Sequence, residues 1–195
     1  MGKEKYLKNI EALFEKSPVV SYASIERSIK NKKKVKEYVK RFINYMLASG
    51  RIKRLSKGYY TKHDEASLAV FCFQPAYFGL QDALSKYNLW EQETVPVIIT
   101  TRKLRTGIRK ILGSNVLIRR IKRKYFFGIE YHQQGNIALP YSDIEKAFID
   151  LIYFKEKINR YVISNLKKEL DKKKLANYLK KYPVQIRKRV ESYLA

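Results

Sequence analysis

Apolar residues in the first thirty positions recur three and four apart, which is the spacing of one face of an α-helix. The first such run predicts a helix with the apolar positions Leu7, Ile10, Leu13 and Phe14. It ends before Pro18, because the residue before a proline disfavours the helical conformation. Ser21 can cap a second helix, in which Tyr22, Ile25 and Ile29 share a face.

A third and longer helix is predicted over 33–49. Its apolar stripe consists of Val35, Val39, Phe42, Ile43, Met46 and Leu47. Lys33, Lys36, Glu37, Lys40, Arg41 and Asn44 fall largely on its other faces. The basic run "KNKKK" before it is typical of a turn, and Gly50 supplies a C-terminal stop. We therefore expect an amphipathic helix with a basic outer surface.

After Gly50 the pattern changes from helix to strand. Ile52 and Leu55 lie before the tripeptide "SKG", and Tyr59, Tyr60 and Thr61 lie after it. Such a tripeptide between two short β-prone runs predicts a hairpin with its turn at residues 56–58. Three helices followed by a hairpin are typical of a winged helix-turn-helix.

The rest of the chain alternates short β-rich runs with helices. Strands are predicted at "LAVFCF" (68–73), "VPVIITT" (95–101), "NVLIRRI" (115–121) and "YFFGIEY" (125–131), and helices over 79–89 and 142–155. Three short helices are predicted after residue 156, with restarts at Asp171 and Pro183. They could cap the domain or form a dimer face. The fold class expected is α+β: an N-terminal winged helix-turn-helix over 1–62, then a mixed α/β domain over 63–195 with a helical tail from about 156.

Within the helix predicted over 142–155, an apolar face is formed by Ile144, Ala147, Phe148, Leu151 and Ile152. Glu145, Lys146 and Asp150 fall on the flanks of that face. For these three we expect pairing at a surface or interface, in preference to catalysis.

The charge of the chain points to an acidic partner. Its 195 residues include 42 Lys and Arg against 18 Asp and Glu, a formal net charge of +24, which is far more than solubility requires. Thermal adaptation would raise glutamate together with lysine, and here the acids have not kept pace. Residues 1–62 hold 17 basic and 5 acidic side chains, whereas residues 63–101 hold one lysine against five acids. This change of sign places a domain boundary near His63.

These patterns predict contact with double-stranded DNA. In a winged helix-turn-helix the third helix enters the major groove and the hairpin, or wing, lies against the backbone beside it. The cations expected to contact DNA are Lys33, Lys34, Lys36 and Lys40 on the helix and Arg51, Lys53, Arg54 and Lys57 on the wing. Lysine contacts to phosphate position a protein without specifying a sequence. Base reading would fall to Asn31, Lys33, Lys34 and Glu37.

Four segments of the sequence resemble those of a known protein family, which makes the functional prediction more specific. The segments "GRIKRLSKGYYT", "YFGLQDALSKYNLWEQETVPVIITT", "VLIRRIKRKYFFG" and "LPYSDIEKAFIDLIYF" follow one another in the order found in the abortive-infection antitoxin family AbiEi. The resemblance covers roughly residues 50–154, and the first fifty residues by architecture alone. The sequence departs from the family at Asn88, where glycine is common, although asparagine also tolerates a positive φ. The basic tail after Phe154 has no residue-by-residue counterpart.

The resemblance implies a regulator. Members of this family are antitoxins of type IV toxin-antitoxin systems. They are cytoplasmic DNA-binding repressors of their own operon, and they oppose a nucleotidyltransferase-like toxin without forming a stable complex with it. For this chain it implies operator DNA as the partner. The protein would be a monomer or a homodimer, and a homodimer would match an operator that is an inverted repeat.

A second basic region lies between residues 102 and 124, which hold ten basic residues and no acid. Arg119, Lys122 and Lys124 alternate imperfectly with apolar positions, as on a strand with a cationic outer side. We expect these residues to extend the DNA contact; gripping an acidic protein is the alternative.

Two other function classes stay open. A metal-dependent nuclease needs converging carboxylates, and the nearest set is Glu130, Asp143, Glu145 and Asp150, at a spacing that no catalytic mechanism justifies as a motif. His63 and His132 are isolated, and no nucleotide-binding glycine motif occurs, so no enzyme activity, cofactor or metal is expected. An RNA-binding protein could use the 16 tyrosines for stacking on bases. Tyr22, Tyr38 and Tyr178, however, lie on or beside apolar faces.

The location expected is the cytoplasm. No run approaches the roughly 20 apolar residues of a membrane span, and the N-terminus lacks a secretory pattern. The single cysteine, Cys72, allows no internal disulfide and is expected to be a buried thiol on a strand.

Overall fold

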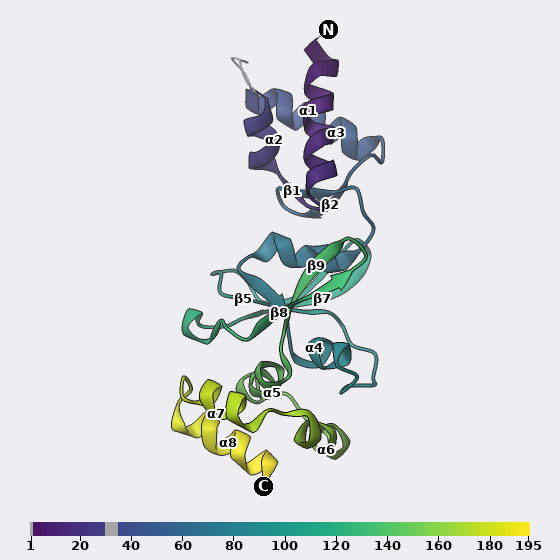
Figure 1. Cartoon of the computed structure of the whole chain (residues 1–195). Helices are drawn as coiled ribbons and strands as arrows, with labels where there is room; N and C mark the ends of the chain where they lie inside the picture. The colour runs from purple at the N-terminus through teal and green to yellow at the C-terminus, as the bar shows by residue number, and fades with distance from the viewer. Residues whose placement is uncertain (1, 30–34) are drawn as a thin grey trace. The chain divides into compact units, whose positions relative to one another are not determined.

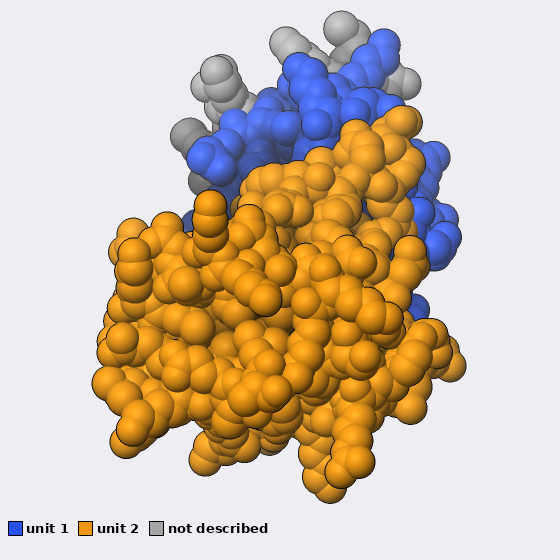
Figure 2. Space-filling model, turned by 60° about the horizontal axis from the view of Figure 1, so that its bottom comes forward, with its two compact units in different colours: residues 1–72, 110–114 blue, residues 73–109, 115–195 orange. Residues whose placement is uncertain are grey.

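The computed structural model describes residues 2–29 and 35–195. The chain divides into two compact units, residues 1–72 with 110–114 and residues 73–109 with 115–195 (Figures 1 and 2).

Three helices and a small sheet form the first unit. In chain order these are α1 (Gly2–Lys16), β1 (Val20–Ser21), α2 (Tyr22–Ser28), α3 (Val35–Ala48), β2 (Lys53–Ser56) and β3 (Tyr59–Thr61). The predicted helices and hairpin are confirmed, and so is the cap at Ser21, whose Oγ accepts a hydrogen bond from the Ser24 amide at 3.0 Å. β1 was not predicted, because two residues carry no periodicity. It pairs with β3, giving an antiparallel sheet of order β1-β3-β2.

One apolar core joins these elements. It contains residues from all three helices, with α1 supplying Ile10 and Phe14, α2 supplying Ile25, and α3 supplying Val39, Ile43 and Met46. Ile52 and Tyr60 close the core from the hairpin. The buried hydroxyl of Thr61 donates to the Pro18 carbonyl at 2.7 Å, which ties the end of β3 to the segment before β1. The hairpin is therefore an integral part of the helical unit.

The second unit is built on a mixed six-stranded sheet, of which residues 110–114, at the turn between β6 and β7, are grouped with the first unit. The strands are β4 (Ala76–Phe78), β5 (Val97–Thr100), β6 (Gly107–Ile111), β7 (Ser114–Arg120), β8 (Ile129–Gln134) and β9 (Ile137–Ser142), in the spatial order β6-β7-β5-β4-β9-β8. β5 runs parallel to β7 and β4 runs parallel to β9, while β4–β5 and β8–β9 are antiparallel. β5 is buried at all four positions, as expected of a central strand.

Five helices complete this unit: α4 (Leu80–Lys86), α5 (Ile144–Tyr153), α6 (Arg160–Glu169), α7 (Lys172–Leu179) and α8 (Val184–Leu194). α5 packs against α4 and against all three tail helices. The predicted restarts are confirmed, since Asp171 caps α7 by accepting from the amides of Lys173 and Lys174, and Pro183 precedes α8. Asn88, the residue that replaces a common glycine, adopts a positive φ of 57°.

Two strand predictions need correction. The run "LAVFCF" (68–73) lies in a 3₁₀ helix, η1 (Ala66–Phe73), and Cys72 is buried there and not on a strand. A continuous apolar run without periodicity does not distinguish a buried strand from a buried helical segment. The strand predicted over 125–131 begins only at Ile129, because a second 3₁₀ helix, η2 (Arg123–Tyr125), comes before it.

Asp82, in the first turn of α4, makes the stability of the second unit depend on pH. Its Oδ2 accepts a hydrogen bond from the Val97 amide at 3.2 Å, at the start of β5. Burial raises the pKa of this carboxyl from an ordinary 3.8 to about 6, against the hydrogen bond and Lys86, which lower it. The folded state therefore binds a proton more tightly than the unfolded chain does. This contribution to stability is complete below about pH 4 and is lost as the pH rises through about 6.

Replacing Asp82 with asparagine is expected to stabilise the protein at pH 7 by about 2 kcal/mol, because the amide keeps the acceptor for Val97 and never ionises. Urea denaturation of parent and Asp82→Asn at pH 4 and pH 7 measures this. The two proteins should be equally stable at pH 4, where the carboxyl is already protonated. A variant that is no more stable than the parent at pH 7 would contradict the assignment.

Candidate nucleic-acid interface

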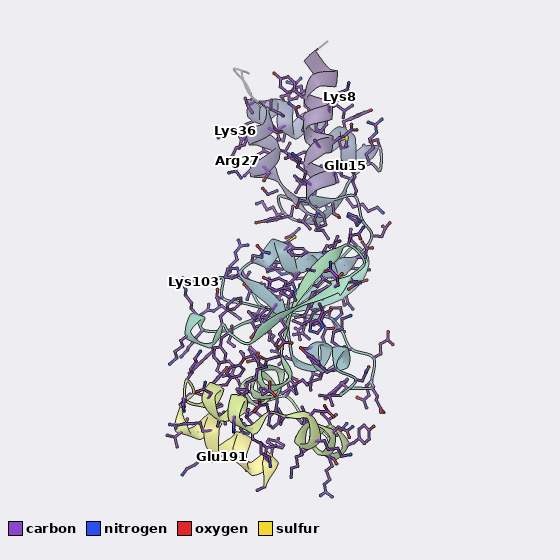
Figure 3. All side chains as sticks on the ribbon, viewed as in Figure 1. Lys8, Glu15, Arg27, Lys36, Lys103 and Glu191 are labelled. Atoms are coloured by element: carbon purple, nitrogen blue, oxygen red, sulfur yellow. The ribbon has the colours of Figure 1, made fainter. Side chains whose placement is uncertain are left out.

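One face of α3 is exposed along its whole length. The exposed residues, Lys36, Glu37, Lys40, Arg41, Asn44, Tyr45 and Ala48, follow the i, i+1, i+4, i+5 spacing of a single helical stripe. The buried residues Val39, Ile43 and Met46 lie opposite, in the core. The stripe is cationic in its first half, where Lys36 extends from the N-terminal end of the helix (Figure 3). It is thus free to meet a polyanion.

The β2–β3 hairpin presents further cations at its turn. Gly58 adopts a φ of 79°, which glycine reaches without strain, and this allows the chain to reverse between Ser56 and Tyr59. Lys57, within this turn, and Arg54, on β2 before it, are both exposed. Lys53, in contrast, forms an ion pair with Asp64, so its charge is already partly neutralised.

A single tyrosine connects the turn of the hairpin to the first turn of α3. The amide of Tyr22 donates to the Gly58 carbonyl at 2.7 Å, and the Tyr22 hydroxyl donates to the Lys36 carbonyl at 3.3 Å. Tyr22 therefore holds the turn of the hairpin next to the first turn of α3. Tyr22 was expected only to fill an apolar face, and its bridging contacts carry no signal in the sequence.

Five cations on these two elements keep their charge available. Within the described residues, none of the ion pairs involves Lys36, Lys40, Arg41, Arg54 or Lys57. Lys33 and Lys34, predicted on the same helix, lie outside the described residues. Arg51 is exposed, and its guanidinium lies 5.8 Å from the centre of the Tyr45 ring.

Tyr45 is the residue of this surface that the sequence reading missed. Its side chain is 55% exposed, although it lies next to the buried Met46. Helical spacing from Arg41 could have found it, since i and i+4 share a face. A tyrosine at this point offers both a ring and a hydroxyl donor to a nucleic acid.

The second predicted basic region is less available. Arg119, on β7, forms an ion pair with Glu156 at 2.7 Å, and its guanidinium lies over the Phe154 ring. The charge of Arg119 is therefore already paired within the second unit. Lys122 and Lys124 are exposed but lie beyond β7, at and within η2, so the three do not form one strand edge.

The acidic residues considered for a nuclease are engaged by cations. Asp150 pairs with Lys146. Pairing at a surface or interface was expected, but both residues are completely buried inside the second unit. Lys174 Nζ lies 3.1 Å from both Asp143 and Glu145 and 3.6 Å from Glu130. Partial burial opposes the charge of Lys174, but the hydrogen bonds that Lys174 donates to Glu145 and Asp143 outweigh it and raise its pKa.

Asp143 and Glu145 also connect the start of α5 to α7. Asp143 caps α5 by accepting from the Lys146 amide at 2.7 Å, and it also accepts from the Tyr178 hydroxyl of α7 at 2.7 Å. Glu145 accepts from the amide of Asp171 at 2.9 Å, at the start of α7. This network joins α5 to α7. Throughout residues 2–29 and 35–195, no group of three or more His, Cys, Asp and Glu side chains is arranged to hold a metal ion.

The tyrosines considered for RNA stacking make contacts inside their own units. Tyr38 stacks on Phe42 with ring centres 6.4 Å apart, and Tyr178 packs edge-on against Phe127. His132, predicted to be isolated, contacts the hydroxyl of Tyr87 at 3.1 Å. His63 lies 3.9 Å from Glu65 on the exposed segment after β3.

Comparisons with known proteins support the fold alone. No protein-family model matches the sequence, and no curated protein matches it. The structure is similar to the crystal structure of the Rv2827c protein from Mycobacterium tuberculosis. The two share 11% sequence identity with a TM-score of 0.59, over 97% of this chain and 76% of that one. They have in common a mixed α+β architecture with N-terminal helices, a mixed six-stranded sheet and C-terminal helices. No helix of the described residues is both long and apolar enough to cross a membrane.

Proposed function

We propose that the chain is a DNA-binding transcriptional regulator whose first unit is a winged helix-turn-helix, with α3 as the recognition helix and the β2–β3 hairpin as the wing. The order α1-β1-α2-α3-β2-β3 is the order of elements in that module. The observation that carries the proposal is the Tyr22 bridge. It keeps the wing turn beside the first turn of α3, so that their cations meet one duplex together.

Phosphate and base contacts are assigned to different residues. The five available cations, Lys36, Lys40, Arg41, Arg54 and Lys57, neutralise phosphates and fix the position of the duplex. Glu37 and Asn44 lie on the exposed stripe of α3 and can accept or donate hydrogen bonds at base edges. Lys33 and Lys34 remain proposed contacts at the start of that helix.

The antitoxin part of the proposal rests on the resemblance to the AbiEi family. It makes the bound DNA the operator of the protein's own operon, and it makes a nucleotidyltransferase-like toxin the functional partner. The Glu-Lys-Ala motif at residues 145–147, one of the segments that carry the resemblance, begins the helix that joins the sheet to the tail. Its polar residues, Glu145 and Lys146, make contacts that support the fold of the second unit.

Binding of the full chain to a labelled duplex, measured by fluorescence anisotropy over a series of salt concentrations, tests the proposal. If each of the five available cations neutralises one phosphate, log affinity should fall against log salt with a slope of about −4.5, and more steeply if Lys33 and Lys34 also contact phosphates. A single-stranded RNA of the same length should bind more weakly. A slope near zero, or a preference for the RNA, would overturn the proposal.

A further inference from the structure

The tail helices enclose a groove that the proposed DNA contact does not use. It lies between α7 and α8, reaches the end of α6 and encloses about 590 Å³. Its floor is apolar and is formed by Leu170, Leu175, Leu179, Val190 and Leu194. The volume is in the range of ligand-binding clefts, which run from roughly 300 to 1,000 Å³.

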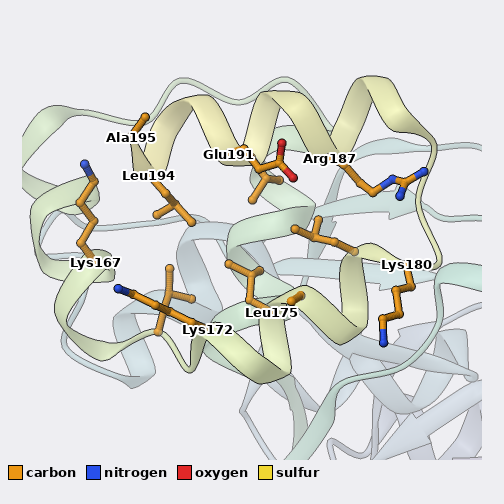
Figure 4. Close-up of a pocket in the computed structure, with 12 residues that line it drawn as sticks. Lys167, Lys172, Leu175, Lys180, Arg187, Glu191, Leu194 and Ala195 are labelled. Carbon is orange, nitrogen blue, oxygen red and sulfur yellow. The ribbon is translucent and has the colours of Figure 1, made fainter.

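Cations lie at both ends of this floor. Lys167 and Lys172 stand at one end, and Lys180 and Arg187 at the other, while Glu191 is the one acidic residue in the lining (Figure 4). The Nε of Arg187 is buried without a hydrogen-bond partner among the described residues.

The spacing of the cations limits the shape of the ligand. Lys172 begins α7 and Lys180 follows its last residue, and the eight residues of this helix rise about 12 Å in all. Two acidic groups about two helical turns apart would match the two ends. A simple aliphatic carboxylate has one charged group, so it would leave one pair of cations unmatched.

Charge also argues against two other occupants. A second copy of this chain brings a net charge of +24, so a cationic groove repels it. Duplex DNA would contact the cations but gain nothing from the apolar floor. An amphipathic helix satisfies both features, because its apolar face packs between two helices while its acidic flanks meet the lysines.

We propose that this groove binds an acidic amphipathic helix of a partner protein. The apolar face of the partner helix lies on Ala176 and Leu194, the accessible apolar residues of α7 and α8 in the lining. Its acidic residues, about seven positions apart, pair with Lys167 and Lys172 at one end and with Lys180 and Arg187 at the other. This surface belongs to the second unit and does not depend on the proposed DNA contact.

The test uses the full chain and a labelled synthetic helical peptide of about 18 residues. Its leucines follow the i, i+3, i+4, i+7 pattern and its glutamates flank that stripe. A scrambled peptide of the same composition is the first control, since it keeps the charge and loses the apolar face. The patterned peptide should bind at least about tenfold more tightly, as a matched apolar face adds roughly 1.4 kcal/mol or more. Equal binding of both peptides would overturn the proposal.

Two triple variants locate the site. Lys167→Glu/Lys172→Glu/Lys180→Glu reverses cations of the groove, while Lys168→Glu/Lys173→Glu/Lys188→Glu reverses exposed neighbours that do not line it. The net charge changes equally. The groove variant should lose about tenfold in affinity for the patterned peptide. The control should lose about twofold, because its exposed lysines do not line the groove and act on the peptide only through solvent and salt. Equal losses overturn the proposal, and so does a groove that binds dodecanoate or duplex DNA but not the peptide.

Discussion

Replacing Lys146 with methionine is expected to destabilise the second unit by about 3–5 kcal/mol at pH 7, the range for removing one partner of a buried ion pair. Lys146 and Asp150 lie one turn apart on α5, and both side chains are completely buried. Lys146 Nζ donates to the Tyr77 hydroxyl at 3.0 Å and to Asp150, and Tyr77 donates to the other carboxylate oxygen at 2.7 Å. Methionine fills a similar volume but leaves the carboxylate without its cation.

The pH dependence of the variant's stability tests whether the unpaired carboxylate of Asp150 causes the destabilisation. Burial raises the pKa of Asp150, and in the parent Lys146 opposes this shift. Without the lysine the folded-state pKa rises further above the unfolded value, so the folded variant binds a proton that the unfolded chain releases. Its stability is then highest in acid and falls as the pH rises above about 4. The loss should accordingly be larger at pH 8 than at pH 5, which urea denaturation at both values measures.

Two further variants separate the lost ion pair from lost packing. Lys146→Met/Asp150→Leu removes both charges, and it should recover most of the stability, because a buried pair replaced by apolar residues is often neutral. Lys188→Met changes an exposed lysine on α8 and should cost no more than about 0.5 kcal/mol. If the double variant is as unstable as Lys146→Met alone, the buried carboxylate is not the cause.

The helices could be predicted from the sequence because their faces differ. α3 separates buried Val39, Ile43 and Met46 from an exposed basic stripe, and this contrast is what periodicity detects. For α5 the same contrast predicted the helix but not the burial of its polar residues. Its polar residues Lys146 and Asp150 occupy the flanks of an apolar face, where sequence places surface charges, yet the tail helices and the sheet cover them.

Contacts between distant segments were beyond the reach of the sequence. Asp64 pairs with Lys53 of the wing, although it lies after the predicted domain boundary, and Glu156 pairs with Arg119 from the predicted tail. Both pairs remove a predicted DNA cation from the available set. The i,i+4 spacing of Lys146 and Asp150 was the one local signal of a buried pair, and helix surfaces show the same spacing commonly. Whether a pair with this spacing is buried or exposed depends on the elements that pack over the helix.

Reversing the charge of the wing is expected to abolish most of the DNA affinity. In Arg54→Glu/Lys57→Glu two available cations become acids, so two phosphate contacts are lost and two repulsions appear, which should weaken duplex binding roughly 100-fold at moderate salt. Because phosphate contacts carry no sequence information, all duplexes should weaken about equally. Lys53 is left unchanged because Asp64 already pairs with it.

The salt dependence of DNA binding tests whether the lost affinity comes from lost phosphate contacts at the wing. Removing two phosphate contacts should reduce the magnitude of the log–log slope by about 2. Lys8→Glu/Lys16→Glu makes the same change in net charge on α1, at exposed lysines, and should cost about threefold at most, since charges outside the contact surface act only through screened fields. If this control matches the wing variant in affinity and slope, the duplex is attracted by net charge alone, and the wing beside α3 is not the contact surface.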